Sequence, residues 1–335
     1  MAWTDNIDPQ DDLFHRTDGD PYWNESSFIS FHDVERNLLG LLYFYFRPNQ
    51  KTAMAGPIIF DQSGSEFSDC LYQAFDWHLP LPDDAQMFDF KLANGFAVQT
   101  IEPLQSYRHT YESRHCNFDL TFQATTEPHY LRLVKGELNP GMADYVKKSS
   151  VPTGHYDQCG LMNGTLTLRG ETLKVVNSPT LRDRTWGARP IRSNVNRLRG
   201  GYTYGQAPNG DCFLIFCTSP LQVEEDPLVG TTENISGGFY NKDGKKGNIA
   251  SGTRRCTGRG PDGRPFGEII DAVDEFGREL HAVGTVRSLI RWPNLWGNVM
   301  CFWCLETFDF DGHVNAAGEL QDYYTYEHGR RMHDP

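Results

Sequence analysis

The clearest pattern in the chain is the alternation of apolar and polar residues within short segments. Between residues 116 and 124, phenylalanine and leucine are separated by polar residues, and this period of two predicts a half-buried β-strand. Residues 40–47 form a nearly continuous apolar run that is closed by Pro48, which predicts a buried strand. No amphipathic helical pattern rivals these strand signals, so the sequence predicts an all-β protein.

Similar signals recur along most of the chain, and between them stand glycine, proline and asparagine turns. Residues 67–77 fit a strand or a short helix equally well. We expect strands at 40–47, 53–60, 88–92, 96–101, 107–109, 116–124, 156–161, 165–168, 201–205, 212–218, 237–241, 249–255, 267–274, 280–286, 300–310 and 323–328.

Two punctuated segments suggest how the strands are grouped. The dipeptide Asn163-Gly164 is typical of a two-residue hairpin turn, so we expect it to join strands 156–161 and 165–168. Residues 135–150 are interrupted by glycine and proline and are the best candidate for a linker. We therefore expect an N-terminal domain at 1–150, with an irregular first segment, and a C-terminal domain at 151–335.

Many short strands with glycine and proline turns are typical of antiparallel sandwiches or barrels. Each half of the 335-residue chain is long enough for one barrel of about eight strands, which has room for one small ligand. The alternative is a single large β-sandwich with a packed core and no ligand.

Composition narrows the classes of partner. A net charge of −13 argues against binding to nucleic acid or to anionic membranes. The aromatic content of 13% suits a large apolar interior or β-structure. The first eight residues lack the basic region and apolar core of a secretory signal, so we expect a cytoplasmic protein.

Eight cysteines are scattered through the chain, which favours reduced and mostly buried thiols. Cys301 and Cys304 form a C-x-x-C pair, but on the expected strand their sulfur atoms would point to opposite faces. Nucleotide-binding and metal-binding motifs are also missing, so we expect neither a cofactor nor a metal.

The best candidate for a functional segment is residues 181–190, Leu-Arg-Asp-Arg-Thr-Trp-Gly-Ala-Arg-Pro, which contains three arginines, one aspartate and one tryptophan. On a strand, Arg182, Arg184 and Trp186 would share one face, and Asp183 and Thr185 the other. Arginine keeps its charge when buried, so an interior arginine needs a partner. The simpler interpretation is a strand end with solvated arginines and a core tryptophan.

Residues 182–189, Arg-Asp-x-x-Trp-Gly-x-Arg, resemble a motif of lipocalin-like proteins related to the carotenoid 1,2-hydratases. Asp-Pro-Tyr-Trp-Asn-Glu-Ser at 20–26 and His-Tyr-Asp-Gln at 155–158 resemble the same group, so the likeness extends from about residue 11 to about residue 328. The resemblance implies two lipocalin-like barrels in tandem. Proteins of this architecture include hydratases and enzymes that guide Diels–Alder cyclisations, so the fold does not fix the reaction.

Hydration of an alkene needs a proton donor, such as a carboxylic acid kept neutral by burial. Glu25 fits best because aromatic neighbours would desolvate it, and Asp157, Glu306 and Glu327 are further possibilities. Asp183 would be a poor acid if a neighbouring guanidinium lowered its pKa. His155 and Tyr156 could present a donor to a substrate carbonyl.

These considerations give two sets of candidate residues. The expected catalytic residues are Arg182, Asp183, Glu25, His155 and Tyr156. The expected substrate-binding residues are Trp186, Trp23, Trp77, Trp303, Tyr324, Arg184 and Arg189. For each of them, a structural role in the core or in an ion pair is the alternative.

A shaped apolar cavity with hydrogen-bond donors suits a cofactor-independent cyclase. We expect a Diels–Alder or hetero-Diels–Alder step on a bulky terpenoid or polyketide intermediate of secondary metabolism. One alternative is acid-catalysed hydration or dehydration of an isoprenoid double bond. Another is a non-catalytic carrier of apolar small molecules.

Overall fold

The computed structural model describes residues 8–130, 154–189, 198–220, 232–293 and 299–325, and in these residues the protein is almost entirely β-structure. The helices among them are three single turns of 3-10 helix, η1 (Pro9–Asp12), η2 (Pro48–Gln50) and η3 (Phe67–Asp69). None of these is long or apolar enough to cross a membrane. The all-β prediction is therefore confirmed.

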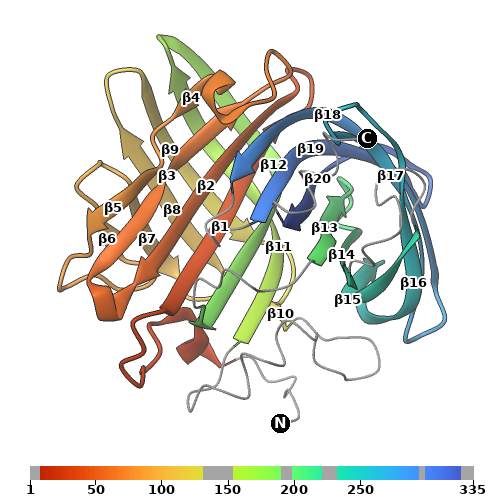
Figure 1. Ribbon diagram of the computed structural model, residues 1–335, viewed down its shortest axis with the longest axis horizontal. Coiled ribbons are helices and arrows are strands. Elements are labelled where there is room, and N and C mark those ends of the chain that lie inside the picture. The colour runs from red at the N-terminus through yellow and green to blue at the C-terminus, as the bar shows by residue number, and fades with distance from the viewer. Residues whose placement is uncertain (1–7, 131–153, 190–197, 221–231, 294–298, 326–335) are drawn as a thin grey trace.

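The first part of the chain forms one curled antiparallel sheet, which begins at one edge with β4 and ends at the other with β6 (Figure 1). Its strands are β1 (Trp23–Asp33), β2 (Leu38–Arg47), β3 (Thr52–Phe60), β4 (Tyr72–Gln73), β5 (Asp76–Pro80), β6 (Phe90–Lys91), β7 (Ala97–Glu102), β8 (Ser106–Glu112), β9 (Cys116–Ala124), β10 (His129–Tyr130), β11 (Gly154–Leu168) and β12 (Glu171–Ala188). The undecided segment 67–77 contains η3, β4 and the start of β5.

The second part closes into an eight-stranded barrel in which each strand pairs with the next and β20 pairs back to β13. Its strands are β13 (Leu198–Gln206), β14 (Cys212–Pro220), β15 (Thr232–Lys242), β16 (Lys245–Arg259), β17 (Pro265–Asp274), β18 (Glu279–Pro293), β19 (Val299–Phe310) and β20 (His313–Thr325). The expected pair of lipocalin-like units is therefore present, one closed and one curled but open.

The division between the two units differs from the expected one at residue 150, which itself lies outside the described residues. Strands β11 and β12 follow that point in the chain, yet β11 pairs with β9 and β12 pairs with β1 in the first sheet. The sheet ends with Ala188 and the barrel begins with Leu198. The pairing partners of β11 and β12, not the linker composition, determine which unit they join.

A single face of the sheet packs against the barrel. In β2, Leu39, Leu41, Tyr43 and Tyr45 enter an apolar core that they share with barrel residues such as Trp292 and Trp303. The alternate residues Leu42, Phe44 and Phe46 enter a separate core on the other face. We call this second face the inner face of the sheet.

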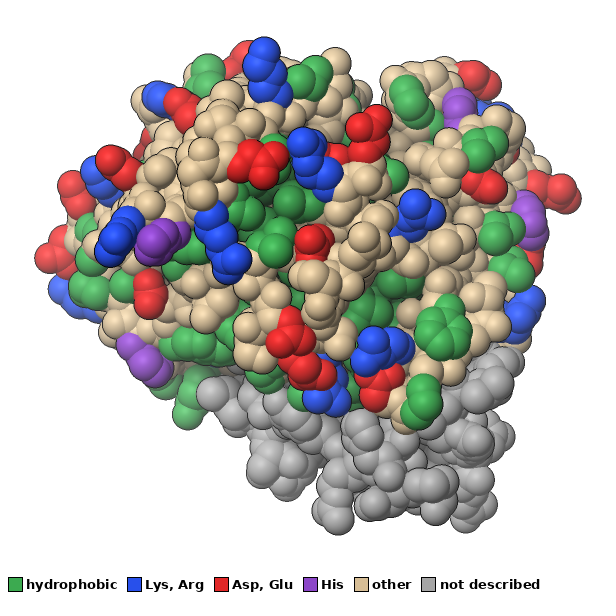
Figure 2. All heavy atoms as spheres, turned by 90° about the horizontal axis from the view of Figure 1, so that it is seen from above, with side chains coloured by type: hydrophobic (Ala, Val, Ile, Leu, Met, Phe, Trp, Pro, Cys, Tyr) green, Lys and Arg blue, Asp and Glu red, His purple; other side chains and the backbone are tan. Residues whose placement is uncertain are grey.

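On the face seen in Figure 2, acidic and basic side chains of the described residues lie intermixed and form no concentrated basic patch.

The Asn163-Gly164 signal is a β-bulge and not the expected hairpin turn. Strand β11 runs through it without interruption, and the register against β12 shifts between Met162 and Gly164. The turn that joins β11 to β12 lies at Arg169-Gly170, where both residues have positive φ angles of 51° and 93°. Positive φ at both central residues is the geometry of a type I′ turn.

Replacing Gly164 by alanine is expected to reduce the free energy of unfolding by about 1–3 kcal/mol. Gly164 has a φ of 145°, and an added Cβ would lie 2.1 Å from the carbonyl oxygen of Asp119 on β9. Gly170→Ala is the matched control, because its φ of 93° is also strained but no atom lies within 4 Å of the added Cβ. Urea denaturation of both variants checks this, and an equal loss in the two would contradict the role of the β9 contact.

Candidate active site between the sheet and the barrel

Strand β12 carries two different networks on its two faces. Arg182, Arg184 and Trp186 point to the inner face, where Arg182 lies over the rings of Phe88 and Tyr107. Asp183 and Thr185 point to the barrel. The expected division of residues 182–186 between the two faces of β12 is therefore confirmed.

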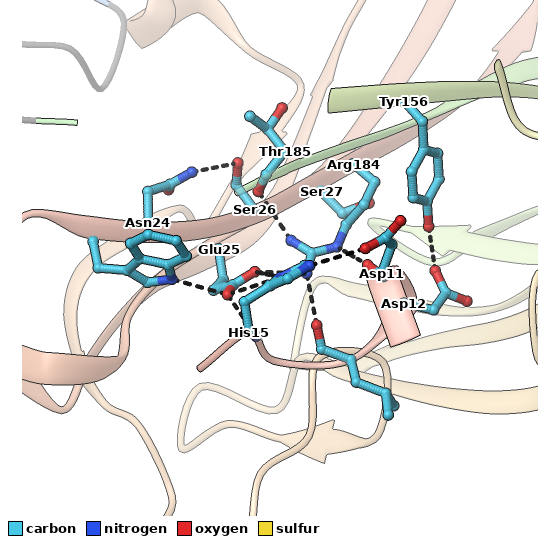
Figure 3. A network of polar contacts seen from close by, with 12 residues as sticks. Asp11, Asp12, His15, Asn24, Glu25, Ser26, Ser27, Tyr156, Arg184 and Thr185 are labelled. Carbon is cyan, nitrogen blue, oxygen red and sulfur yellow. Dashed lines mark hydrogen bonds and ion pairs between the residues drawn. The ribbon is translucent and has the colours of Figure 1, made fainter. Parts of the chain in front are cut away.

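On the inner face, Arg184 fastens the N-terminal segment to the sheet (Figure 3). Its Nη2 lies 2.6 Å from Oε2 of Glu25 and 2.9 Å from the carbonyl oxygen of Leu13, and its Nε donates to the carbonyl of Asp11 at 3.0 Å. Both Arg184 and Glu25 are completely buried. Arg184 therefore has a structural role, because it holds residues 11–13 against Glu25 on β1. We call this arrangement of Arg184, Glu25 and the Asp11 and Leu13 carbonyls the Arg184 clamp.

Glu25 does not have the properties expected of a proton donor. Burial would raise the pKa of Glu25, but Arg184 and His15 outweigh this effect and hold the pKa below its usual value. The indole of Trp23 donates to the same carboxylate at 2.9 Å. Glu25 therefore stays ionised, and we correct its expected role from general acid to the anionic half of the clamp.

Arg182 is also buried, and each of its three guanidinium nitrogens has a hydrogen-bond partner. Its Nη1 lies 2.7 Å from Oδ1 of Asp12, and its Nε and Nη2 donate to Oε1 of Gln158 at 3.1 and 2.8 Å. The hydroxyls of Tyr107 and Tyr156 donate to the same Asp12 carboxylate. Arg182 and Tyr156 thus use their donors within the protein, which argues against the expected donation to a substrate.

The barrel-facing side of β11 and β12 carries a compact acid–base cluster of His155, Asp157, Asp183 and Thr185, with Tyr202 from β13. His155 Nε2 lies 2.9 Å from Oδ2 of Asp157, and Nδ1 lies 2.7 Å from the hydroxyl of Thr185. Oδ2 of Asp183 is 3.6 Å from Nδ1 of His155. The hydroxyl of Tyr202 donates to Asp157, which ties the barrel to the sheet at this point.

The local sequence explains why these groups meet. His155 and Asp157 are two residues apart on β11, and Asp183 and Thr185 are two residues apart on β12, so each pair shares a face. The antiparallel register places Asp157 opposite Asp183 and His155 opposite Thr185. Tyr202 comes from the first strand of the barrel, and no local sequence signal connects it with this hairpin.

Burial determines the proton affinities of the cluster. Desolvation raises the pKa of Asp183 to about 6; His155 opposes this shift and Asp157 adds to it. Burial alone would lower the pKa of His155, but the carboxylates of Asp157 and Asp183 outweigh it and raise that pKa. Arg182 and Arg184, which flank Asp183 in sequence, point away from it, so the condition under which it would be a poor acid is not met. Arg189 lowers the pKa of Asp183, but burial outweighs this effect.

The side chains of His155 and Asp183 each keep 12% of their surface exposed, whereas that of Asp157 keeps none. His155 and Asp183 are therefore partly accessible to solvent, whereas Asp157 is not. The neighbourhood is apolar, because Phe28 lies directly opposite Asp183 in the register and packs edge-on against Tyr43 and Tyr202.

One nitrogen or oxygen atom each of His155, Asp157 and Asp183 lie within 4.8 Å of one another, so this set is also a candidate for holding a metal ion. Mixed nitrogen and carboxylate ligands suit several divalent metals. However, both ring nitrogens and both oxygens of Asp157 already have protein partners. One proton each on His155 and Asp183 would balance the charge of the set without a metal.

The remaining expected binding residues do not meet in one pocket. Trp23 and Trp186 belong to a small cluster on the inner face, where Trp186 stacks on His15 at 4.3 Å. Trp303 is buried between sheet and barrel and donates to Glu319 at 2.6 Å, while Tyr324 packs on Phe302 inside the barrel.

Trp77 lies elsewhere, whereas the positive charge of Arg189 acts on the cluster to lower the pKa of both His155 and Asp183. Trp77 is 37% exposed and packs on Phe75. The carbonyl oxygen of Arg189 accepts from Arg47 at 2.9 Å, just after the end of β12. Of the expected site residues, the structure therefore brings His155 and Asp183 together, with Asp157 and Arg189 acting on both. It adds Thr185 and Tyr202.

A curled antiparallel sheet packed against a closed eight-stranded barrel, with a buried acid–base cluster between them, defines a lipocalin-like two-domain protein. The chain belongs to the DUF7064 family, described as a domain of unknown function, whose model matches residues 8–294. None of the curated proteins compared with the chain matches it.

Solved structures share this fold over most of their length. A putative AttH from Nitrosomonas europaea is 11% identical with a TM-score of 0.54, and the match covers 90% of this chain and 92% of that one. Kievitone hydratase from Nectria haematococca is 11% identical with a TM-score of 0.51, covering 90% and 88%. CghA in complex with Sch210972 is 9% identical with a TM-score of 0.53, covering 91% and 89%. At these identities the likeness establishes the fold alone, which is the fold implied by the sequence resemblance.

Proposed function

We propose that this protein is a cofactor-independent enzyme that hydrates or dehydrates an apolar, unsaturated small molecule at the His155–Asp157–Asp183 cluster. The observation that carries the proposal is the position of Asp183, a nearly buried carboxyl group beside a histidine, with a pKa raised to about 6. A carboxylic acid with such a pKa is protonated often enough near neutral pH to donate a proton.

In the proposed reaction, protonated Asp183 transfers its proton to an alkene carbon, and its carboxylate then faces the carbocation. Water adds to the cation, and the proton released from the added water returns to Asp183. The reverse sequence removes a hydroxyl group as water. The protonated His155 and ionised Asp157 stay paired throughout and stabilise the Asp183 carboxylate.

This proposal replaces the cycloaddition that the sequence favoured. The donors expected for a cyclase were Arg182, His155 and Tyr156. Arg182 and Tyr156 are occupied by Asp12 and Gln158, and the ring nitrogens of His155 by Asp157 and Thr185. The kievitone hydratase likeness is compatible with hydration, and the likeness to CghA, a Diels–Alderase, is equally compatible with cyclisation. The choice of hydration over cyclisation therefore rests on the raised pKa and the position of Asp183 in the His155–Asp157–Asp183 cluster.

The test is incubation with a panel of prenylated phenols and linear polyenes in oxygen-labelled water, followed by mass spectrometry. A product heavier by one labelled water supports the proposal. A cyclised product without label would instead identify a cyclase, and ligands recovered unchanged from the protein would identify a carrier. Either of these outcomes would overturn hydration.

The rate should depend on pH in a defined direction. Because the active form of Asp183 is protonated, kcat/KM is expected to be constant at low pH and to fall about tenfold per unit above pH 6. Prior dialysis against a chelator should leave this profile unchanged. A rate that rises through the same range would contradict a general acid, and loss of activity on chelation would instead indicate a metal on these ligands.

A further inference from the structure

The interior of the closed barrel contains a second polar cluster, separate from the proposed active site on its outer side. Arg254 is completely buried there. Its guanidinium forms ion pairs with Glu233, Glu268 and Asp322. Arg259 contributes a second guanidinium, which donates to Asp322 from two nitrogens.

The carboxyl groups of this interior outnumber its cations among the described residues. Glu233, Glu268, Glu306 and Asp322 are four carboxyl groups, all buried, and only Arg254 and Arg259 face them. Burying a charge without a partner is costly. If all four carboxyl groups were ionised, the excess charge would be negative, and a bound cation would balance it.

Glu306 is the group without a partner. It is completely buried, and neither of its carboxyl oxygens has a hydrogen-bond partner among the described residues. Its side chain occupies the space beside Gly284 on β18, where an added Cβ would lie 2.3 Å from Oε1. The glycine leaves room for the carboxyl group inside the barrel.

Apolar groups lie on both sides of this carboxyl group along the barrel. Phe308 and Phe310 follow on the same face of β19 and belong to one apolar cluster. Cys304 precedes it on that face and packs with Phe302 and Leu320 in another. A ligand that satisfied Glu306 would therefore combine a charged head with an apolar body.

We propose that the closed barrel binds a small organic cation, an ammonium group on an apolar chain, with Glu306 as the partner of the ammonium. An ammonium supplies positive charge and three N–H donors to a carboxyl group whose oxygens have no hydrogen-bond partner among the described residues. Burial raises the pKa of Glu306 well above its usual value, so the empty site holds the protonated acid. Binding of the ammonium converts the acid to the carboxylate and releases that proton to solvent.

The experiment uses the full chain and three probes of matched length, hexylammonium, hexanol and hexanoate. Calorimetric titration near neutral pH in two buffers of different ionisation enthalpy measures both the affinity and the number of protons released. Hexylammonium is expected to bind with release of about one proton, and the two other probes should not bind. Glu306→Gln should weaken the binding at least about tenfold and abolish the proton release.

Glu306→Gln replaces a neutral acid by a neutral amide of similar shape, so it should fold. The matched control is Glu279→Gln, an exposed position on β18, which should bind like the unaltered protein. Equal binding of hexanol, no binding of hexylammonium, or unchanged binding and proton release in Glu306→Gln would each overturn the proposal. The proton count in the unaltered protein tests it independently of any variant.

Discussion

Replacing Asp183 by asparagine is expected to lower kcat/KM by about a hundred- to ten-thousandfold, the range typical of losing a general acid. The amide cannot supply the proton that starts hydration. The substitution keeps the size of the side chain and can preserve the hydrogen bond with Thr185, which lies 3.3 Å from Oδ1. The loss should therefore appear in the rate while the thermal unfolding midpoint stays close to that of the unaltered protein.

The chain offers a close control for this variant. Asp271 and His281 form another aspartate–histidine pair on adjacent strands, with 2.6 Å between Oδ1 and Nδ1, but both side chains are more than half exposed. Asp271→Asn should leave the rate unchanged. If Asp183→Asn retained both the rate and the fall above pH 6, Asp183 would not be the acid, and the proposed function would fail with it.

The sequence predicted which side chains share a face of β12 but not what they meet there. Period-two alternation separates Arg182 and Arg184 from Asp183 wherever the strand lies. The partner of each arginine comes instead from distant segments, Asp12 in η1 and Glu25 in β1. Local neighbours suggested that a guanidinium would hold Asp183 ionised and that burial would keep Glu25 neutral. The structure reverses both protonation states, because burial raises the pKa of Asp183 while Arg184 lowers that of the buried Glu25.

Because the sequence placed the β11–β12 turn at the wrong residues, it did not predict that Asp157 lies opposite Asp183. A turn at Asn163-Gly164 would have put Asp157 opposite Gly170, whereas the actual turn puts it opposite Asp183. Asn-Gly favours positive φ in bulges and in turns alike, so its local chemistry does not distinguish them. By contrast, Cys301 and Cys304 do lie on opposite faces of β19, as expected, because that prediction needed only the strand period.

Replacing Arg184 by methionine is expected to reduce the free energy of unfolding by about 3–5 kcal/mol, the usual cost of removing one partner of a buried ion pair. The Glu25 carboxylate would lose its 2.6 Å partner while remaining buried. The carbonyls of Asp11 and Leu13 would lose their donor as well, which detaches the N-terminal segment from the sheet. Urea denaturation at pH 7 measures the loss.

The control is Arg108→Met, because Arg108 pairs with Asp119 at the same 2.6 Å but both side chains are about half exposed. Solvent screens an exposed pair, so this variant should change stability little. If Arg184→Met and Arg108→Met reduced the free energy of unfolding equally, the buried Arg184–Glu25 pair would have no special stabilising role.

The same pair predicts how stability responds to acid. The pKa of Glu25 is lowered in the folded protein, so its contribution is present above the ordinary glutamate pKa and is lost as the pH falls through the folded value. Without Arg184 the main cause of that lowering disappears and burial raises the pKa of Glu25 instead. The Arg184→Met variant should then gain stability as the pH falls from the raised pKa of Glu25 to the ordinary glutamate pKa, whereas the unaltered protein loses the Glu25 contribution only below that ordinary value. The Glu25→Gln/Arg184→Met double variant should not show this gain.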